Sequence, residues 1–201
     1  MDQDAAQFPS VGCCTGAEVV PGRYAFPAWF DIPLAIDVPS GWRVLNEPGA
    51  GLFMLGRGEN ELGTPNEIVL FLDATDAGTG QQLIDGILNV PQLAGGEASP
   101  LSLADFDGWQ GGTNALSNPE FEGDPAADIP AGVQPLPSIE RFLTEGFTWT
   151  TSTPEAELFL STVDVVDRRL LIYLEAPPGD MDAFAADAIP MLESLSTSDE
   201  P

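Results

Sequence analysis

The segment most suited to chemistry runs from residue 105 to 112 and reads DFDGWQGG. Asp105 and Asp107 stand two apart before Gly108, which is how a calcium-binding loop begins. The sequence then departs from such a loop. No third oxygen ligand follows at the next step, and Leu116 occupies the twelfth position, where a closing Glu belongs. We therefore expect a turn here, and a cation site on Asp105 and Asp107 is the alternative.

Tryptophans are the second group of candidate functional residues. The chain has four of them, at positions 29, 42, 109 and 149. Pockets for small ligands are lined largely by apolar and aromatic side chains, so we take Trp42, Trp109 and Trp149 as candidate ligand-binding residues. Ordinary packing in a core or on a sheet is the alternative for each of them. Trp149 lies in FTWTT, an alternating pattern typical of a strand with one polar face.

Much catalytic chemistry is excluded by composition. The chain contains no His, and its six basic residues are all Arg. Ser-His-Asp catalysis, lysine-dependent phosphate loops and Schiff-base chemistry are therefore ruled out. Acid–base catalysis would fall to carboxylates, as in glycosidases, but nothing marks Glu67, Glu157 or Glu175 as special. We assign no catalytic residue and no cofactor, and a carboxylate-dependent hydrolase of a sugar or ester remains an alternative function.

The only two cysteines, Cys13 and Cys14, are adjacent. Neighbouring cysteines can close only a strained ring, and two sulfur ligands without His do not make a zinc site. Val11-Gly12-Cys13 is similar to a lipid-attachment site with Cys13 as the lipidated residue, but the apolar stretch that should precede it is missing. The start of the chain also lacks the basic and apolar regions of a signal peptide. We keep lipid attachment at Cys13 as an alternative.

Charge limits the partners. The 201 residues include 32 acidic and 6 basic side chains, for a net charge of −26. Nucleic acids and anionic membranes bind proteins through basic patches, so we expect no nucleic-acid partner and no direct binding to an anionic membrane. The acidity can reflect solubility or a halophilic source. The 43% apolar content is enough for a core.

The elements that would position these residues can be read from periodicity. We expect a flexible leader over 1–17 and a single globular domain over 18–201. Alternating or apolar runs predict a series of strands, and Thr79 to Leu88 has the spacing of a helical face. Pro39-Ser40-Gly41 predicts a turn with positive φ at the glycine. The expected strands are 34–38, 42–45, 52–55, 67–72, 139–150, 157–165 and 169–174.

Two connections and a final helix complete the prediction. A hairpin over 101–109 should bend at Asp107-Gly108, and a second should bend at 166–168. Residues 117–138 contain five prolines and read as a long loop. A stripe of seven apolar residues predicts a helix that docks on the sheet, with Asp180 as N-cap and Pro190 kinking or splitting it. The stripe comprises Met181, Phe184, Ala185, Ala188, Ile189, Leu192 and Leu195. Strands with two helices indicate an α+β fold, an antiparallel sheet flanked by helices.

Three segments resemble the PsbP-like fold, whose members include photosystem extrinsic proteins and actinobacterial lipoproteins. They are IDVPSGW (36–42), TPNEIVLFL (64–72), and the hairpin ELFLSTVDVVDRRLLIYLEAP (157–177) followed by a helix ending in LESLS (192–196). The resemblance implies an α/β/α sandwich outside the cytoplasm, secreted or anchored to the bacterial envelope. Members usually bind or assemble with partners and are not enzymes. The long acidic loop at 117–138 departs from the family pattern.

We therefore expect a noncatalytic extracytoplasmic binding or interaction domain, with lipid anchoring through Cys13 as one form of it. Two alternatives belong to other classes. One is the carboxylate-dependent hydrolase, which would need two carboxylates facing one pocket about 5–9.5 Å apart. The other is a structural module of an envelope assembly, which a large exposed apolar patch would favour.

Overall fold

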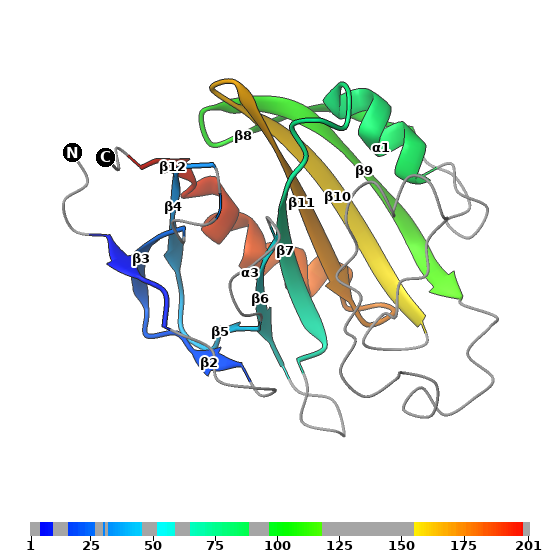
Figure 1. The fold of residues 1–201 in the computed structure, drawn as a ribbon. Coiled ribbons are helices and arrows are strands. Elements are labelled where there is room, and N and C mark those ends of the chain that lie inside the picture. Colours follow the sequence, from blue (N-terminus) through cyan, green and yellow to red (C-terminus); the bar gives the residue numbers. More distant parts are fainter. Residues whose placement is uncertain are drawn as a thin grey trace, which may run out of the picture.

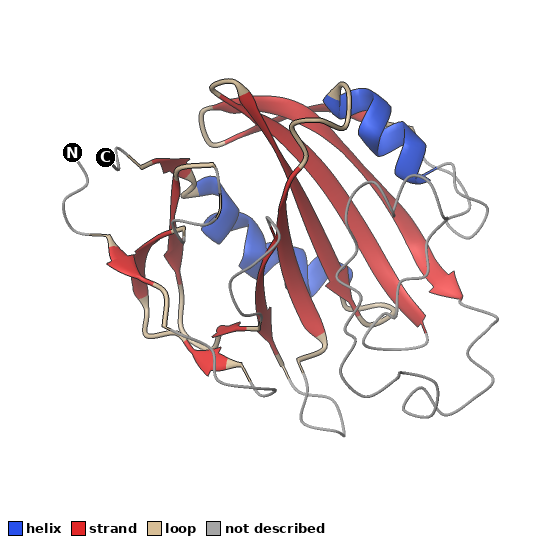
Figure 2. Cartoon of the chain, in the orientation of Figure 1, coloured by secondary structure: helices blue, strands red, loops and turns tan. Residues whose placement is uncertain are grey.

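The computed structural model describes residues 5–9, 16–26, 30, 32–45, 52–58, 65–88, 97–117 and 155–198. Within these ranges the chain forms a four-stranded and an eight-stranded sheet, together with two helices (Figures 1 and 2). The strand pairs are antiparallel with one exception, so the α+β class expected from the sequence is confirmed.

The large sheet has the strand order β2-β5-β6-β7-β11-β10-β9-β8. The expected strands at 34–38, 52–55, 67–72, 157–165 and 169–174 are all present, and most are longer than expected. The expected strand at 139–150 and nearly all of the 117–138 loop lie outside the described residues. The strands of this sheet are β2 Ala17–Glu18, β5 Arg43–Val44, β6 Leu52–Arg57, β7 Glu67–Asp73, β8 Ser99–Leu103, β9 Phe106–Ser117, β10 Glu155–Val165 and β11 Arg168–Ala176.

The small sheet has the order β1-β3-β4-β12, formed by β1 Ala6–Gln7, β3 Gly22–Ala25, β4 Leu34–Val38 and β12 Ser196–Thr197. Its first strand lies within the expected leader, so the leader is not wholly separate from the fold. Ala6–Gln7 pairs in parallel with β3, and the ring of Phe8 stacks on Tyr24 with centroids 4.7 Å apart. Aromatic burial explains why this short polar segment is ordered despite having no periodicity.

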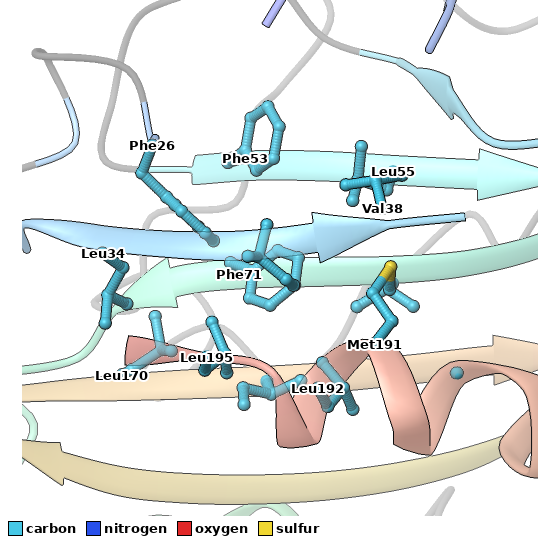
Figure 3. Close-up of a cluster of buried hydrophobic side chains, with 14 of the residues drawn as sticks. Phe26, Leu34, Val38, Phe53, Leu55, Phe71, Leu170, Met191, Leu192 and Leu195 are labelled. Carbon is cyan, nitrogen blue, oxygen red and sulfur yellow. The ribbon is translucent and has the colours of Figure 1, made fainter. Parts of the chain in front are cut away.

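Two cores lie on opposite faces of the large sheet. Along β11, Leu170, Ile172 and Leu174 face one core, while Leu171 and Tyr173 face the other. The first core is closed by the small sheet and by α3 (Met181–Glu193), which packs against β4 and β11 (Figure 3). The second is closed by α1 (Gly80–Leu88), which packs against β9 and β10 (Figure 1). The alternation is what a strand buried on both faces requires.

Helix α3 docks where the sequence predicted, but its buried face is rotated. Phe184 and Leu192 are fully or nearly fully buried, whereas Ile189 is 43% exposed and Met191 is buried in its place. At about 100° per residue, position 189 lies roughly 100° from the centre of the buried face, and 191 lies close to that face. Pro190 stands inside a continuous helix and does not split it.

The N-terminus of α3 is completed by a distant residue. Asp180 occupies the N-cap position, as expected, but its side chain makes no capping hydrogen bond. The backbone N–H of Met181 instead donates to Oε2 of Glu157, 3.3 Å away on β10. A carboxylate at this end also interacts favourably with the helix dipole.

The hairpin prediction at 101–109 was right about the hairpin and wrong about its bend. Leu103 pairs with Phe106, so the turn is Ala104-Asp105, with Ala104 at φ 52°. Asp107 and Gly108 lie inside β9. Gly108 is needed there because a Cβ would collide with the backbone of Thr162 on β10. The glycine therefore permits close strand approach instead of making the turn.

Candidate functional site

An open groove of about 600 Å³ lies where the small sheet, the large sheet and α3 meet. Its walls come from β3, β4, the turn after β4, β6 and the second half of α3. The turn is the expected Pro39-Ser40-Gly41, and Gly41 has the predicted positive φ, at 87°. These segments are far apart in sequence, so the groove exists only after both sheets and α3 have packed.

Strand and helix periodicity place one aspartate on each side of this groove. On β4, Ile36 and Val38 are buried while Asp37 between them is exposed. On α3, Asp187 precedes the buried Ala188 and faces outward, with 62% of its side chain exposed. Asp37 is 58% exposed. Both carboxylates are thus accessible from solvent at the groove.

Arg57 is the central residue of the groove. It lies at the end of β6, directly opposite Glu67 on β7, and its Nε donates to Glu67 Oε2 at 2.5 Å. A second nitrogen, Nη1, donates to Asp187 Oδ2 at 2.8 Å. Its guanidinium carbon lies 5.6 Å from the ring centre of Trp42 and 5.4 Å from that of Phe184. Arg57 thereby joins β6, β7 and α3 by two ion pairs and two cation–π contacts.

The charge of Arg57 is stabilised by these partners. Burial alone would lower its pKa, but the hydrogen bonds that it donates to Glu67 and Asp187, together with the attraction of their charges, raise the pKa above its ordinary value. The guanidinium is therefore a fixed cation, and its Nε and Nη1 donate to protein carboxylates.

Arg23 on β3 is held in a similar way. Its Nη1 donates to Asp37 Oδ1 at 3.0 Å and, more weakly, to the carbonyl of Ser194 at 3.4 Å. Its Nη2 donates to the hydroxyl of Ser196 at 2.6 Å. Both arginines in the groove are thus bound to the protein itself, while the outer carboxylate oxygens, Asp37 Oδ2 and Asp187 Oδ1, have no protein partner within the described residues.

The three candidate tryptophans fall in different places. Trp42 is fully buried and lines the groove from below, where the guanidinium of Arg57 covers its ring. Trp109 is half-buried on β9 and packs into the core beneath α1, beside Gly80. Trp149 lies outside the described residues. The structure therefore brings Trp42 to the groove and places Trp109 on the opposite side of the large sheet.

Of the candidate cation and lipid sites, the described residues include only the cation site. Asp105 is exposed in the turn and Asp107 is exposed on β9. Across the part of the chain that the structure describes, no three or more Asp, Glu, Cys or His side chains gather in a way that could hold a metal ion. Cys13 lies outside the described residues.

Sequence reasoning did not single out Arg23, Asp37, Arg57 or Asp187. An arginine at the end of an apolar strand is unusual in a chain with only six basic residues, and that signal could have marked Arg57. Its partner Asp187 is 130 residues away, so the pairing depends on how α3 docks. No local pattern could have revealed it.

A second buried polar pair lies on the α1 side of the large sheet. Tyr173 and Glu175 are 3% and 1% exposed, and the tyrosine hydroxyl donates to Glu175 Oε2 at 3.1 Å. Burial, and then the negative charge of Glu175 and the hydrogen bond to it, raise the pKa of Tyr173 well above its ordinary value. The pair is separated from the groove by the large sheet.

Within the described ranges, neither helix is long and apolar enough to span a membrane. Comparison with known proteins gives no family for this chain: no protein-family model matches the sequence, and no curated protein matches it significantly.

Proposed function

We propose that this chain is a noncatalytic binding domain that acts outside the cytoplasm and holds its partner in the groove between β4, β6 and α3. The observation that carries the proposal is the construction of this groove. Arg57 is fixed over Trp42 by Glu67 and Asp187, and Asp37 and Asp187 reach solvent beside it. Side chains held this rigidly lose little entropy when a ligand binds.

The proposal includes a PsbP-like α/β/α sandwich. It is supported by the placement of α1 and α3 on opposite faces of one antiparallel sheet, together with the sequence motifs at 36–42 and 64–72. The extracytoplasmic location rests on the same resemblance.

The proposal also has a lipid-anchored form, in which Cys13 is the attachment site. In bacterial lipoproteins the lipidated cysteine becomes the first residue of the mature chain, so β1 and Phe8 would be removed. Phe8 contacts Tyr24, Phe26 and Phe53, with ring centres 4.7, 6.3 and 4.6 Å apart. These contacts favour a mature chain that retains the residues before Cys13. The intact mass of the protein purified from its native host would decide between the two forms.

The arrangement of carboxylates supports binding over hydrolysis. A glycosidase-type acid needs a carboxyl group in a surrounding that keeps it protonated. In the groove, Asp37 and Asp187 are more than half exposed and each pairs with an arginine, unlike the desolvated carboxyl group of such an acid. For the envelope-module alternative, the exposed large hydrophobic residues in the described ranges are Val20 between β2 and β3, Val166 in the turn between β10 and β11, and Ile189 on α3.

A groove-filling variant tests the proposal. Gly22 is exposed and lines the groove, and a Cβ added there would meet its nearest atom, on Tyr24, at 3.8 Å, so Gly22→Tyr adds a ring at this wall of the groove without a clash at Cβ. Gly86 on α1 is also exposed, with no atom within 4 Å of an added Cβ, which makes Gly86→Tyr the matched control.

The measurement is the shift in melting temperature caused by a panel of ligands: basic, acidic and neutral peptides, an oligosaccharide and a fatty acid. We expect at least one class to stabilise the wild-type chain and the Gly86→Tyr variant but not Gly22→Tyr. If no class acts in this way, or if every effect survives Gly22→Tyr, the groove is not the binding site and the proposal fails.

A further inference from the structure

Hydrogen-bond donors and acceptors in the groove differ in how far protein partners already occupy them. This difference bears on which ligand the groove binds. Its strongest donors belong to Arg23 and Arg57, and each guanidinium is already engaged by protein acceptors. An anionic ligand that approached either guanidinium would come close to the carboxylates of Asp37, Glu67 or Asp187, which repel it.

Acceptors, in contrast, remain open. Asp37 and Asp187 each direct one carboxylate oxygen at an arginine and, among the described residues, have no partner for the other. Pro190, which also lines the groove, has no N–H, so the Ala186 carbonyl one turn earlier lacks its usual helical donor. Ser40 adds a hydroxyl at the turn. A ligand that complements these acceptors brings hydrogen-bond donors.

The charge balance points the same way. Arg57 with Glu67 and Asp187 carries a net charge of 1 − 2 = −1, and Arg23 with Asp37 is neutral. The whole chain carries −26. A field of this sign attracts cations and repels anions before contact, which raises association rates with basic partners.

We infer that the groove binds a basic segment of a partner protein, with lysine or arginine side chains that bond to the open oxygens of Asp37 and Asp187. This inference rests on the proposed function and adds the chemistry of the partner to it. Glu67 and Trp42 take no direct part in recognition, because they lie behind Arg57 and hold it in place.

The experiment uses fluorescein-labelled peptides of seven residues, Gly-Lys-Gly-Lys-Gly-Lys-Gly and the same peptides with Gln or Glu in place of Lys. Fluorescence anisotropy at 0.15 M NaCl gives Kd for the full chain. The test variant is Asp37→Asn/Asp187→Asn. The control is Asp76→Asn/Asp182→Asn, which removes the same two charges from exposed positions outside the groove. Circular dichroism confirms that each variant is folded.

We expect the lysine peptide to bind and the groove variant to weaken its binding at least tenfold, whereas the control weakens it less than twofold. Equal weakening by both variants would mean that binding follows net charge, and the inference would fail. It would also fail if the Gln or Glu peptide bound as well as the Lys peptide. If the Gln or Glu peptide binds in this way, loss of its binding in Gly22→Tyr would still support the groove as a binding site, although not one for basic segments.

Discussion

At the scale of single residues, Arg57 combines several structural contacts in one side chain. One guanidinium satisfies two carboxylates and covers two aromatic rings. Glu67 is only 17% exposed, and its ion pair with Arg57 compensates for part of its desolvation. Arg57 therefore supports the groove and the packing of α3 at the same time.

Replacing Arg57 by Met should lower the free energy of unfolding by about 2–4 kcal/mol, because Glu67 is left as a mostly buried charge without its main partner. The double variant Arg57→Met/Glu67→Leu should recover at least half of that loss, since an apolar pair of similar volume replaces the ion pair. Urea denaturation measures both. A double variant as unstable as the single one would show that the aromatic contacts, not the ion pair, carry the stability.

Tyr173 should make the protein sensitive to alkali. An unfolded chain ionises its tyrosines near pH 10, while the folded chain keeps Tyr173 protonated because its pKa is raised by burial and by Glu175. Above about pH 10 the unfolded state therefore releases a proton that the folded state retains, and the free energy of unfolding falls as pH rises. Below that pH this contribution to stability is fully present.

The melting temperature measured between pH 8 and 11 tests this. We expect it to fall above about pH 10 in the wild-type chain and to fall less steeply in Tyr173→Phe. The chain has no Lys, and Tyr24 is its only other tyrosine, so few other groups titrate in this range. Identical slopes in the two proteins would show that Tyr173 does not control the alkaline limit.

At the scale of elements, the sequence predicts what depends on local periodicity. The strands at 34–38 and 67–72, the helix at 80–88 and the docking of α3 follow from runs or stripes of apolar residues. The prediction failed where two parts of the chain approach closely. Asp107-Gly108 has the sequence of a turn, yet Gly108 is needed inside β9 because β10 passes too near for a side chain. Only the pairing of β9 with β10 reveals this.

The rotation of α3 gives a direct prediction. Ile189→Ala should change the free energy of unfolding by less than about 1 kcal/mol, because its side chain is 43% exposed. Met191→Ala should cost about 2–5 kcal/mol, because Met191 is buried against the strands in the core shown in Figure 3. Chemical denaturation of both variants tests the orientation of the helix. A larger loss from Ile189→Ala would place the buried face where the sequence stripe put it.

At the scale of the whole molecule, the charge of −26 should govern the response to salt. Compact folding brings carboxylates together, and screening relieves their repulsion, with a screening length of about 10 Å at 0.1 M salt. We expect NaCl and CaCl₂ at equal ionic strength to raise the melting temperature similarly, and Asp107→Asn to respond in the same way. A rise at micromolar calcium that is lost in Asp107→Asn would instead establish a calcium site at Asp105 and Asp107.

The groove itself could not be predicted from the sequence, because it belongs to the assembled molecule. Arg57 and Asp187 meet across 130 residues, and Arg23 reaches Ser196 across 173. Composition did indicate which chemistry such a site could use. A chain without His or Lys has carboxylates, arginines and aromatic rings to build with, and the groove contains all three.

The most direct test of a binding groove over Trp42 is ¹⁹F NMR of the full chain labelled with 5-fluorotryptophan. The four tryptophans give separate reporters, and Trp42→Phe and Trp109→Phe identify two of the signals. On titration with the lysine peptide, the Trp42 signal should shift and saturate, because Trp42 lines the groove beneath Arg57, while the Trp109 signal stays fixed on the far side of the large sheet. A saturable shift of Trp109 with Trp42 unchanged would contradict the account.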